Sequence, residues 1–335
     1  MARAPAAVFG SLLCLLVAGC ASASDDPNTV VVGLLPVPDL VALRLGEAKG
    51  FFAEQGIKVR FIDVPRGDAA VSALLSNTVH FANVDVVTGL IAREQQLPIQ
   101  WVTTVHSSPD RADVAFQGVY VRPDSPIRRW ADLAGRKVNT SCRKCGSELY
   151  LRGAVDRNGG DSARIQLVTM PTAQAVPALG RGQLDAASVS PGLVPKAEAA
   201  GFRKIGDPIA ETALGHPLGP IAVNTVWADS HPRQLKAFIR AAEKSTIYAA
   251  EHPAEARAAM PRYFPQIVPD RQAAARVPLA AWSRCFQMDA IRSIADYTLR
   301  YGFTHTPVAR LSDLFYSGHA IAPRTCRSPI PPRGS

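Results

Sequence analysis

The feature that most constrains this chain is a regular alternation of short apolar runs with segments of helical pattern. "TVVVGLLP" (29–36) is a continuous apolar run bounded by proline, which is typical of a strand buried in a parallel sheet. Residues 39–52 carry apolar side chains at helical spacing, and Ile57, Val59 and Phe61 then alternate with basic residues as in a strand. The same order repeats to about residue 105, which predicts parallel α/β units.

The stretch "EAKGFFAEQGIKVRF" (47–61) forms the first connection from helix to strand. Gly50 interrupts the helical run, and Gly56 breaks the chain again before the strand. Glycine adopts the backbone conformations that end helices, so both positions indicate turns. We expect Phe51 and Phe52 to pack beneath the sheet rather than to contact a ligand.

The α/β pattern restarts at "GVYVRP" (118–123), and "GPIAVNTVWA" (219–228) is a second short β-rich segment of the same kind. Two such segments flanking one unit predict a two-strand hinge. After residue 227 the chain becomes mainly helical. We therefore predict a lobe 1 made of residues 29–121 and 220–335, and a lobe 2 made of residues 122–219.

The N-terminus has the pattern of an export signal. Arg3 precedes the apolar run "AAVFGSLLCLLVA", which is too short for a comfortable membrane span. The run ends in "LVAGC", which resembles a bacterial lipobox cleaved before Cys20. We predict a signal peptide over 1–19, a lipid on Cys20 and a polar tether over 20–28, so that the body lies outside the cytoplasm, anchored to the cell membrane. A secretion signal cut near "ASA" is the alternative.

Four cysteines remain after the signal: Cys142, Cys145, Cys285 and Cys326. An even number in an oxidising compartment indicates disulfides. The sequence does not choose among the possible pairings, and we predict Cys142–Cys145 and Cys285–Cys326. A C-x-x-C pair at a helix start is also the pattern of thiol–disulfide oxidoreductases, and zinc is a further option. The surrounding sequence lacks the rest of either motif, so we expect no metal.

The charge and the motifs restrict the function class. The net charge of +9 is dispersed, without the basic blocks that mark nucleic-acid-binding segments, so we expect no nucleic-acid partner. This charge would favour an anionic ligand if part of it faced a cleft. The enzyme motifs G-x-S-x-G, H-E-x-x-H and G-x-x-x-x-G-K-[ST] are absent from the sequence, which favours a binding protein over an enzyme.

Four stretches carry a resemblance to a known family: "EAKGFFAEQGIKVRF", "DLAGRKVNTS", "GQLDAASVSPGLV" and "HPRQLKAFIRA". In this order they resemble the type II solute-binding proteins of ABC importers for nitrate, aliphatic sulfonates, taurine and thiamine-precursor pyrimidines. The resemblance implies an α/β, two-lobed type II periplasmic-binding-protein fold with a two-strand hinge and C-terminal helices. It also implies a small-molecule ligand between the lobes, an ABC permease and its ATPase as partners, and no cofactor. We expect a monomer.

The candidate ligand site follows from the strand order. Ligands of open α/β sheets bind beyond the carboxyl ends of the strands, often at helix N-termini. The loop 140–147 is the most unusual candidate, because its cysteine pair departs from the family pattern. Asp39 is the expected N-cap of the first helix, and it is also a ligand candidate. The predicted ligand-binding residues are Pro38, Asp39, Arg66, Gly67, Asn83, Asp85, Thr88, Thr140, Ser141, Gly146, Ser147, Ser188, Ser190 and Asn224.

The ligand stays open among small anions and small heterocycles. An aromatic ligand would need a stacking partner, and the candidates are Trp101, Tyr120, Trp227 and Trp282, although core packing is the better interpretation of each. Two other functions also stay open. One is a pyrimidine-precursor synthase-like enzyme of the same fold, against which the export signal argues. The other is a sensory lipoprotein that passes ligand occupancy to a membrane partner.

Overall fold

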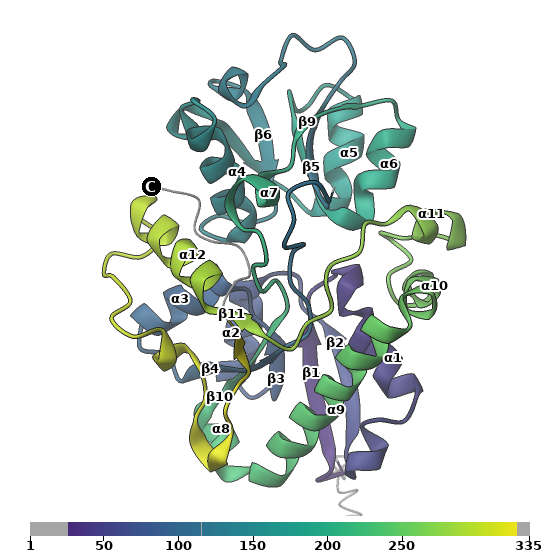
Figure 1. Cartoon of the computed structure of the whole chain (residues 1–335), viewed down its shortest axis with the longest axis vertical. Coiled ribbons are helices and arrows are strands. Elements are labelled where there is room, and N and C mark those ends of the chain that lie inside the picture. The colour runs from purple at the N-terminus through teal and green to yellow at the C-terminus, as the bar shows by residue number, and fades with distance from the viewer. Residues whose placement is uncertain (1–25, 115, 327–335) are drawn as a thin grey trace, which may run out of the picture.

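The computed structural model describes residues 26–114 and 116–326, so the predicted signal peptide and Cys20 lie outside the described residues. Two α/β bodies lie one above the other along the long axis of the molecule (Figure 1). Within the described part, no helix combines the length and the apolar character needed to cross a membrane.

The lower body in Figure 1 is built on a five-stranded sheet in the order β2-β1-β3-β10-β4. β1 pairs in parallel with β2 and β3, whereas β10 returns from far along the chain and pairs antiparallel with β3 and β4. Along the chain, this strand follows all the elements of the upper body. The strands are β1 (Thr29–Leu34), β2 (Lys58–Asp63), β3 (Phe81–Asn83), β4 (Ile99–Thr104) and β10 (Pro220–Asn224).

Helices cover the lower sheet and enclose its core. On α9, Phe238 is fully buried and stacks on Phe81 with ring centroids 3.9 Å apart. Burying one such side chain contributes about 1.5–3 kcal/mol, so contacts of this kind hold the helix layer to the sheet. The helices of this body are α1 (Val41–Ala48), α2 (Gly67–Leu75), α3 (Val86–Glu94), α8 (Thr225–Ser230) and α9 (Pro232–Glu251).

The connection 47–61 has the structure that its glycines predict. α1 ends at Ala48, and Gly50 and Gly56 have φ angles of +80° and +72°. Phe52 is 2% exposed and lies 5.8 Å from Phe238 between ring centroids. The prediction that the phenylalanines are core residues is therefore confirmed.

The upper body has two small sheets of its own, β8-β5-β9 and β6-β7. The bridge Val138↔Ala186 joins β6 to the chain just before β8. A separate apolar cluster around Trp130, Leu133 and Val138 fills this body. Its elements are β5 (Gly118–Val121), β6 (Lys137–Thr140), β7 (Gln166–Thr169), β8 (Ala187–Val189), β9 (Arg203–Gly206), α4 (Gly146–Arg157), α5 (Thr172–Gly180), α6 (Val194–Ala199) and α7 (Pro208–Thr212).

Two extended segments connect the bodies and pair with each other. Ser107 forms an antiparallel bridge with Pro217, and the Leu218 N–H donates to the His106 carbonyl at 3.0 Å. Ser107 also forms an antiparallel bridge with Ala281, so the segment around Ala281 is a third strand-like segment at this crossing. We predicted that 118–123 would form one strand of the hinge and that lobe 1 would include residue 121, but β5 is the central strand of the upper sheet. Its four residues are all buried, so it belongs to a core and the crossings lie outside it. The lobe boundaries as such stay a prediction.

The C-terminal helices run back along both bodies, with α12 contacting α3 and α4. Tyr301 of this region donates to the Asp156 carboxylate at 2.8 Å, which links it to the upper body. Both predicted disulfides, Cys142–Cys145 and Cys285–Cys326, are present. The remaining elements are α10 (Pro253–Tyr263), α11 (Arg271–Arg276), β11 (Phe286–Gln287), α12 (Met288–Arg300) and β12 (Thr325–Cys326).

Candidate functional site

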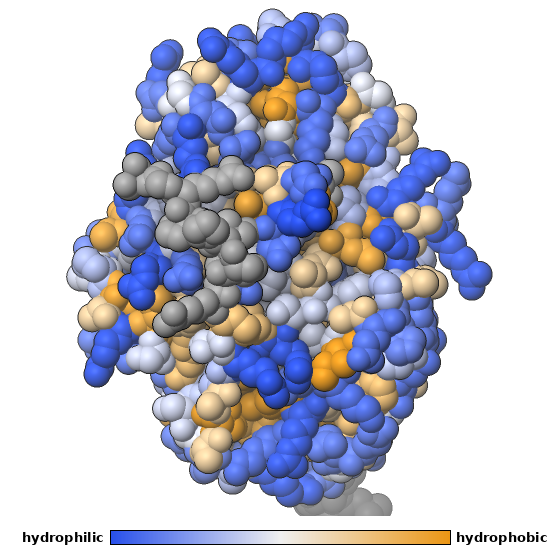
Figure 2. Space-filling model, viewed as in Figure 1, coloured by the Kyte–Doolittle hydropathy of each residue, from blue (hydrophilic) through white to orange (hydrophobic). Residues whose placement is uncertain are grey.

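A cavity of about 240 Å³ lies between the two bodies, with walls from both. The lower body supplies the loops after β1, β2 and β3, and the upper body supplies the loop before α4 and the residues after β8. Figure 2 shows apolar surface at mid-height, where the bodies meet. The predicted ligand-binding residues that line the cavity are Pro38, Asp39, Arg66, Gly67, Asn83, Asp85, Ser141, Gly146, Ser147 and Ser190.

Four predicted ligand residues lie outside the cavity wall, and each makes a local hydrogen bond instead. Thr88 donates to Asp85 at 2.6 Å, and Thr140 donates to the Cys142 carbonyl at 2.7 Å, so both support loops that do line the cavity. The Ser188 N–H donates to the Asn139 side chain at 2.8 Å. Asn224 caps α8 and donates to the Leu74 carbonyl at 3.2 Å. Thr88 and Thr140 act through neighbours, whereas Ser188 and Asn224 are structural.

Asp39 is a buried carboxylate of the cavity wall rather than the predicted N-cap. Pro38 starts a short 3-10 turn over Pro38–Leu40, so α1 begins at Val41 and Asp39 lies one residue too early to cap it. The carboxylate instead accepts a hydrogen bond from the Ala280 N–H at 3.1 Å. The side chain is 1% exposed, and this burial raises the pKa of Asp39 from 3.8 to about 6.

Asp85 is the second carboxylate of the wall. It caps α3 by accepting from the Thr88 N–H at 3.2 Å, and burial raises its pKa. Gly67 packs against the hydrogen-bonded side chains of Asp85 and Thr88. A Cβ at Gly67 would lie 2.6 Å from Thr88 Oγ1 and 2.8 Å from Asp85 Oδ2. The glycine is therefore required for the close approach of α2 to the cap of α3.

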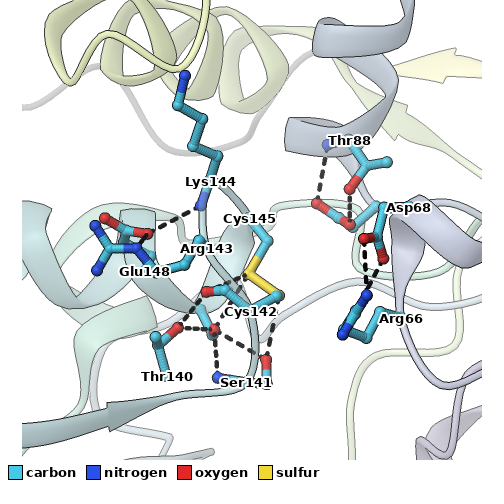
Figure 3. The surroundings of a disulfide bond; sticks show 12 residues. Arg66, Asp68, Thr88, Thr140, Ser141, Cys142, Arg143, Lys144, Cys145 and Glu148 are labelled. Carbon is cyan, nitrogen blue, oxygen red and sulfur yellow. Dashed lines mark hydrogen bonds and ion pairs between the residues drawn. A yellow bond between two sulfur atoms is a disulfide. The ribbon is translucent and has the colours of Figure 1, made fainter. Parts of the chain in front are cut away.

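The positive charge that the sequence places near the site is neutralised locally. Arg66 donates two hydrogen bonds of 3.0 Å to Asp68, and its side chain is 51% exposed. On the opposite loop Arg143 forms an ion pair with the buried Glu148, which also binds Arg152. Figure 3 shows this loop across from Arg66 and Asp68. Among the described residues that line the cavity, Arg66 is the only lysine or arginine.

The disulfide loop forms the upper wall. Both cysteines, Cys142 and Cys145, line the cavity, and Cys145 is the N-cap residue of α4. Ser147 shares a hydrogen bond of 2.7 Å with Thr140 and accepts from the Ser141 N–H at 3.2 Å (Figure 3). These bonds fix the loop, so that the first turn of α4 presents backbone N–H groups to the cavity.

Two groups that line the cavity, Tyr150 and His106, were missed by sequence reasoning. Tyr150 lines the cavity one turn after Gly146, and the i, i+4 spacing on α4 is the signal that was available. Its side chain is 6% exposed, and no hydrogen bond joins its hydroxyl to another described residue. His106 also lines the cavity, whereas His216 lies behind it, packed edge-on against Tyr150 at 5.6 Å between ring centroids. Burial lowers the pKa of both histidines to about 3, so both are uncharged.

The remaining wall is largely apolar, with Leu35, Val37, Phe116, Ile209 and Leu218 among its residues. The four aromatic residues predicted as stacking candidates are not part of the wall. Trp101 and Tyr120 are 2% and 1% exposed core residues, and Trp227 packs with Phe81. Trp282 donates to the Asp39 carbonyl at 2.9 Å and so supports the wall from behind. Within the described residues there is no cluster of three or more His, Cys, Asp or Glu suited to a metal ion.

Two α/β bodies with a cavity between them define the two-lobed fold of the periplasmic binding proteins, as predicted. The chain belongs to the NMT1/THI5-like family, whose model matches residues 37–256. The bicarbonate-binding protein CmpA of Synechococcus elongatus is 23% identical over 247 residues, which are 65% of this chain and 53% of that protein. The chain thus spans about half the length of the curated relatives it matches.

Similarity to known structures covers nearly the whole chain. The periplasmic aliphatic sulphonate binding protein SsuA from Escherichia coli aligns with a TM-score of 0.69 and 14% identity, over 92% of this chain and 99% of that one. The desulfurization enzyme DSZB aligns with a TM-score of 0.62 and 14% identity, over 86% and 96%. The fold is therefore shared by binding proteins and by an enzyme, and these identities bear on the fold alone.

Proposed function

We propose that this protein is an extracytoplasmic solute-binding protein that captures a small ligand between its lobes and delivers it to the permease of an ABC importer. The observation that carries the proposal is the cavity itself, which takes its walls from both bodies. A ligand bound there would contact both lobes at once, so its binding energy would favour a closed arrangement that a permease can recognise.

The family supports this function, because CmpA and SsuA bear the names of binding proteins. The predicted lipobox supports a lipid on Cys20, which would keep the protein close to its membrane partner. We infer that the protein acts as a monomer that presents the rims of both lobes to the permease.

An enzyme of the same fold is the second candidate, since DSZB is named as one. Among the groups that line the cavity, Asp39 could transfer a proton near neutral pH because its pKa is raised to about 6, whereas the histidine and the cysteines could not. His106 stays uncharged until the pH falls to about 3, so it does not act as an acid near neutral pH. Cys142 and Cys145 form a disulfide, so neither offers a free thiol as a nucleophile.

The test is a thermal-shift screen of the purified protein without reductant, against anions, amines, pyrimidines and amino acids. A ligand at a hundredfold excess over Kd should stabilise the protein by about 2.7 kcal/mol, which raises Tm by a few degrees. The proposal expects such a shift with recovery of the unchanged compound. Conversion of the compound to a product would support the enzyme instead, and a lack of any shift would favour a sensory or accessory lipoprotein.

A further inference from the structure

The cavity wall carries a charge pattern that is opposite to the net charge of the chain. Asp39, which is buried, and Asp85, which is partly buried, are carboxylates of the cavity wall, and the lining Arg66 is already bound to Asp68 by two hydrogen bonds. Arg143 belongs to the disulfide loop but pairs with Glu148. Of the lysines and arginines in the described part of the chain, only Arg66 lines the cavity, and its charge is paired with Asp68.

A simple anion would meet unfavourable electrostatics at the lower wall. A carboxylate that is largely removed from water repels a second negative charge more strongly than an exposed one does. The first turn of α4 offers N–H groups that favour an acceptor atom, but a helix terminus carries only about half an elementary charge. One partial positive charge above does not offset two carboxylates below.

Two polar atoms of the wall, Asp39 Oδ2 and the Tyr150 hydroxyl, indicate what the wall would accept. Oδ2 of Asp39 makes no hydrogen bond to another described side chain, so it can accept from a ligand. The hydroxyl of Tyr150 also lacks a partner among the described residues although the side chain is 6% exposed. Nδ1 of His106 also has no partner, but it is fully enclosed and lies toward Gly219, so a ligand in the cavity does not reach it. Polar groups that are largely buried are normally paired, so a ligand that fills the cavity is expected to pair with Asp39 and Tyr150.

We propose that the cavity selects a small nitrogen compound that donates N–H hydrogen bonds to Asp39 and Asp85 and places an acceptor or ring edge toward Tyr150 and α4. An amidine, an amine and an uncharged N–H heterocycle share this chemistry. Nitrate-like, bicarbonate-like and sulfonate-like anions lack it, so the cavity discriminates against them. This inference rests on the proposed solute-binding function and specifies its ligand class.

The experiment compares probes of the same shape and opposite hydrogen-bonding character by isothermal titration calorimetry. The pairs are benzamidinium with benzoate and guanidinium with nitrate, and cytosine represents an uncharged heterocycle. Each donor should bind with a Kd at least about tenfold lower than that of its matched anion, since a charge-assisted hydrogen bond contributes that much. An anion that binds as tightly as its partner overturns the inference.

Variants show whether the carboxylates are responsible. Asp39→Asn keeps the shape and an oxygen for the Ala280 N–H but removes the charge, and it should weaken benzamidinium binding about tenfold or more. Asp85→Asn should act in the same direction. Asp270→Asn is the matched control, because Asp270 caps α11 by accepting from the Ala273 N–H at 2.7 Å and is not part of the cavity wall. Unchanged binding in Asp39→Asn would refute the assigned role.

The outcomes separate the ligand class from the function. Tight binding of an anion, with release of the unchanged compound, would refute the proposed ligand class but would still support the solute-binding function. If no cationic, anionic or uncharged probe binds, the proposed ligand class is refuted, and the result also counts against the solute-binding function. Thermal unfolding of each variant, measured alongside, confirms that a lost affinity does not arise from a lost fold.

Discussion

The Cys285–Cys326 disulfide should contribute more to stability, whereas the Cys142–Cys145 disulfide should contribute more to ligand binding. Cys285 and Cys326 are 41 residues apart in sequence, whereas Cys142 and Cys145 are 3 apart. In the chain-entropy model, removing a cross-link lowers the free energy of unfolding by the closure entropy of its loop. This gives about 4 kcal/mol for the long loop and about 1.6 kcal/mol for the short one at 25 °C.

The structure gives a further reason for the larger effect of the long loop. Cys326 lies in β12, which pairs with β11 next to Cys285, and the preceding segment packs on the lower sheet. There the Tyr316 N–H donates to the Trp101 carbonyl at 2.9 Å. Without the cross-link, this C-terminal segment would be held only by such local contacts.

The assay is urea unfolding of two double variants, Cys285→Ser with Cys326→Ser and Cys142→Ser with Cys145→Ser, each extrapolated to water. The first should lose more stability than the second while keeping probe affinity. The second should bind the tightest probe of the panel more weakly, because its loop is part of the cavity wall. Equal stability losses, or unchanged affinity in the Cys142/Cys145 variant, would refute this reasoning.

Three further predictions concern single residues. Because burial raises the pKa of Asp39 from 3.8 to about 6, the native state binds more protons than the unfolded chain between these values. Its contribution therefore lowers the free energy of unfolding by about 3 kcal/mol as the pH rises from about 4 to about 6, and Asp39→Asn should remove this fall in denaturant titrations across that range. Gly67→Ala should cost about 1–3 kcal/mol and weaken probe binding, since its Cβ would displace Thr88 from Asp85; retained affinity in calorimetry would contradict the packing argument. Phe238→Ala should cost about 3–5 kcal/mol in urea unfolding with no change in probe Kd, and a changed Kd would show that the core and the cavity are coupled.

Sequence reasoning was most successful where a local pattern has a single physical solution. An uninterrupted apolar run such as Val30 to Leu34 is stable only inside a sheet covered on both faces, and it forms β1. Gly50 can adopt a positive φ angle at little cost, so it marks the helix end whatever surrounds it. Strand ends also predict which loops meet, and for this reason Asp39, Gly67, Asn83 and Asp85 were expected at the site and line its cavity.

Tertiary structure decided what the local pattern leaves free, above all the partners of polar groups. Asp39 receives its hydrogen bond from Ala280, 241 residues away, because the crossing segment folds back over the first turn. His106 and Tyr150 face the cavity only because a paired crossing and α4 meet there. The net charge of +9 suggested an anionic ligand, yet Arg66 is the only lysine or arginine among the described residues that line the cavity, and it is paired with Asp68. Composition counts charges, whereas the Coulomb interaction depends on their distances and on burial, and these exist only in the folded chain.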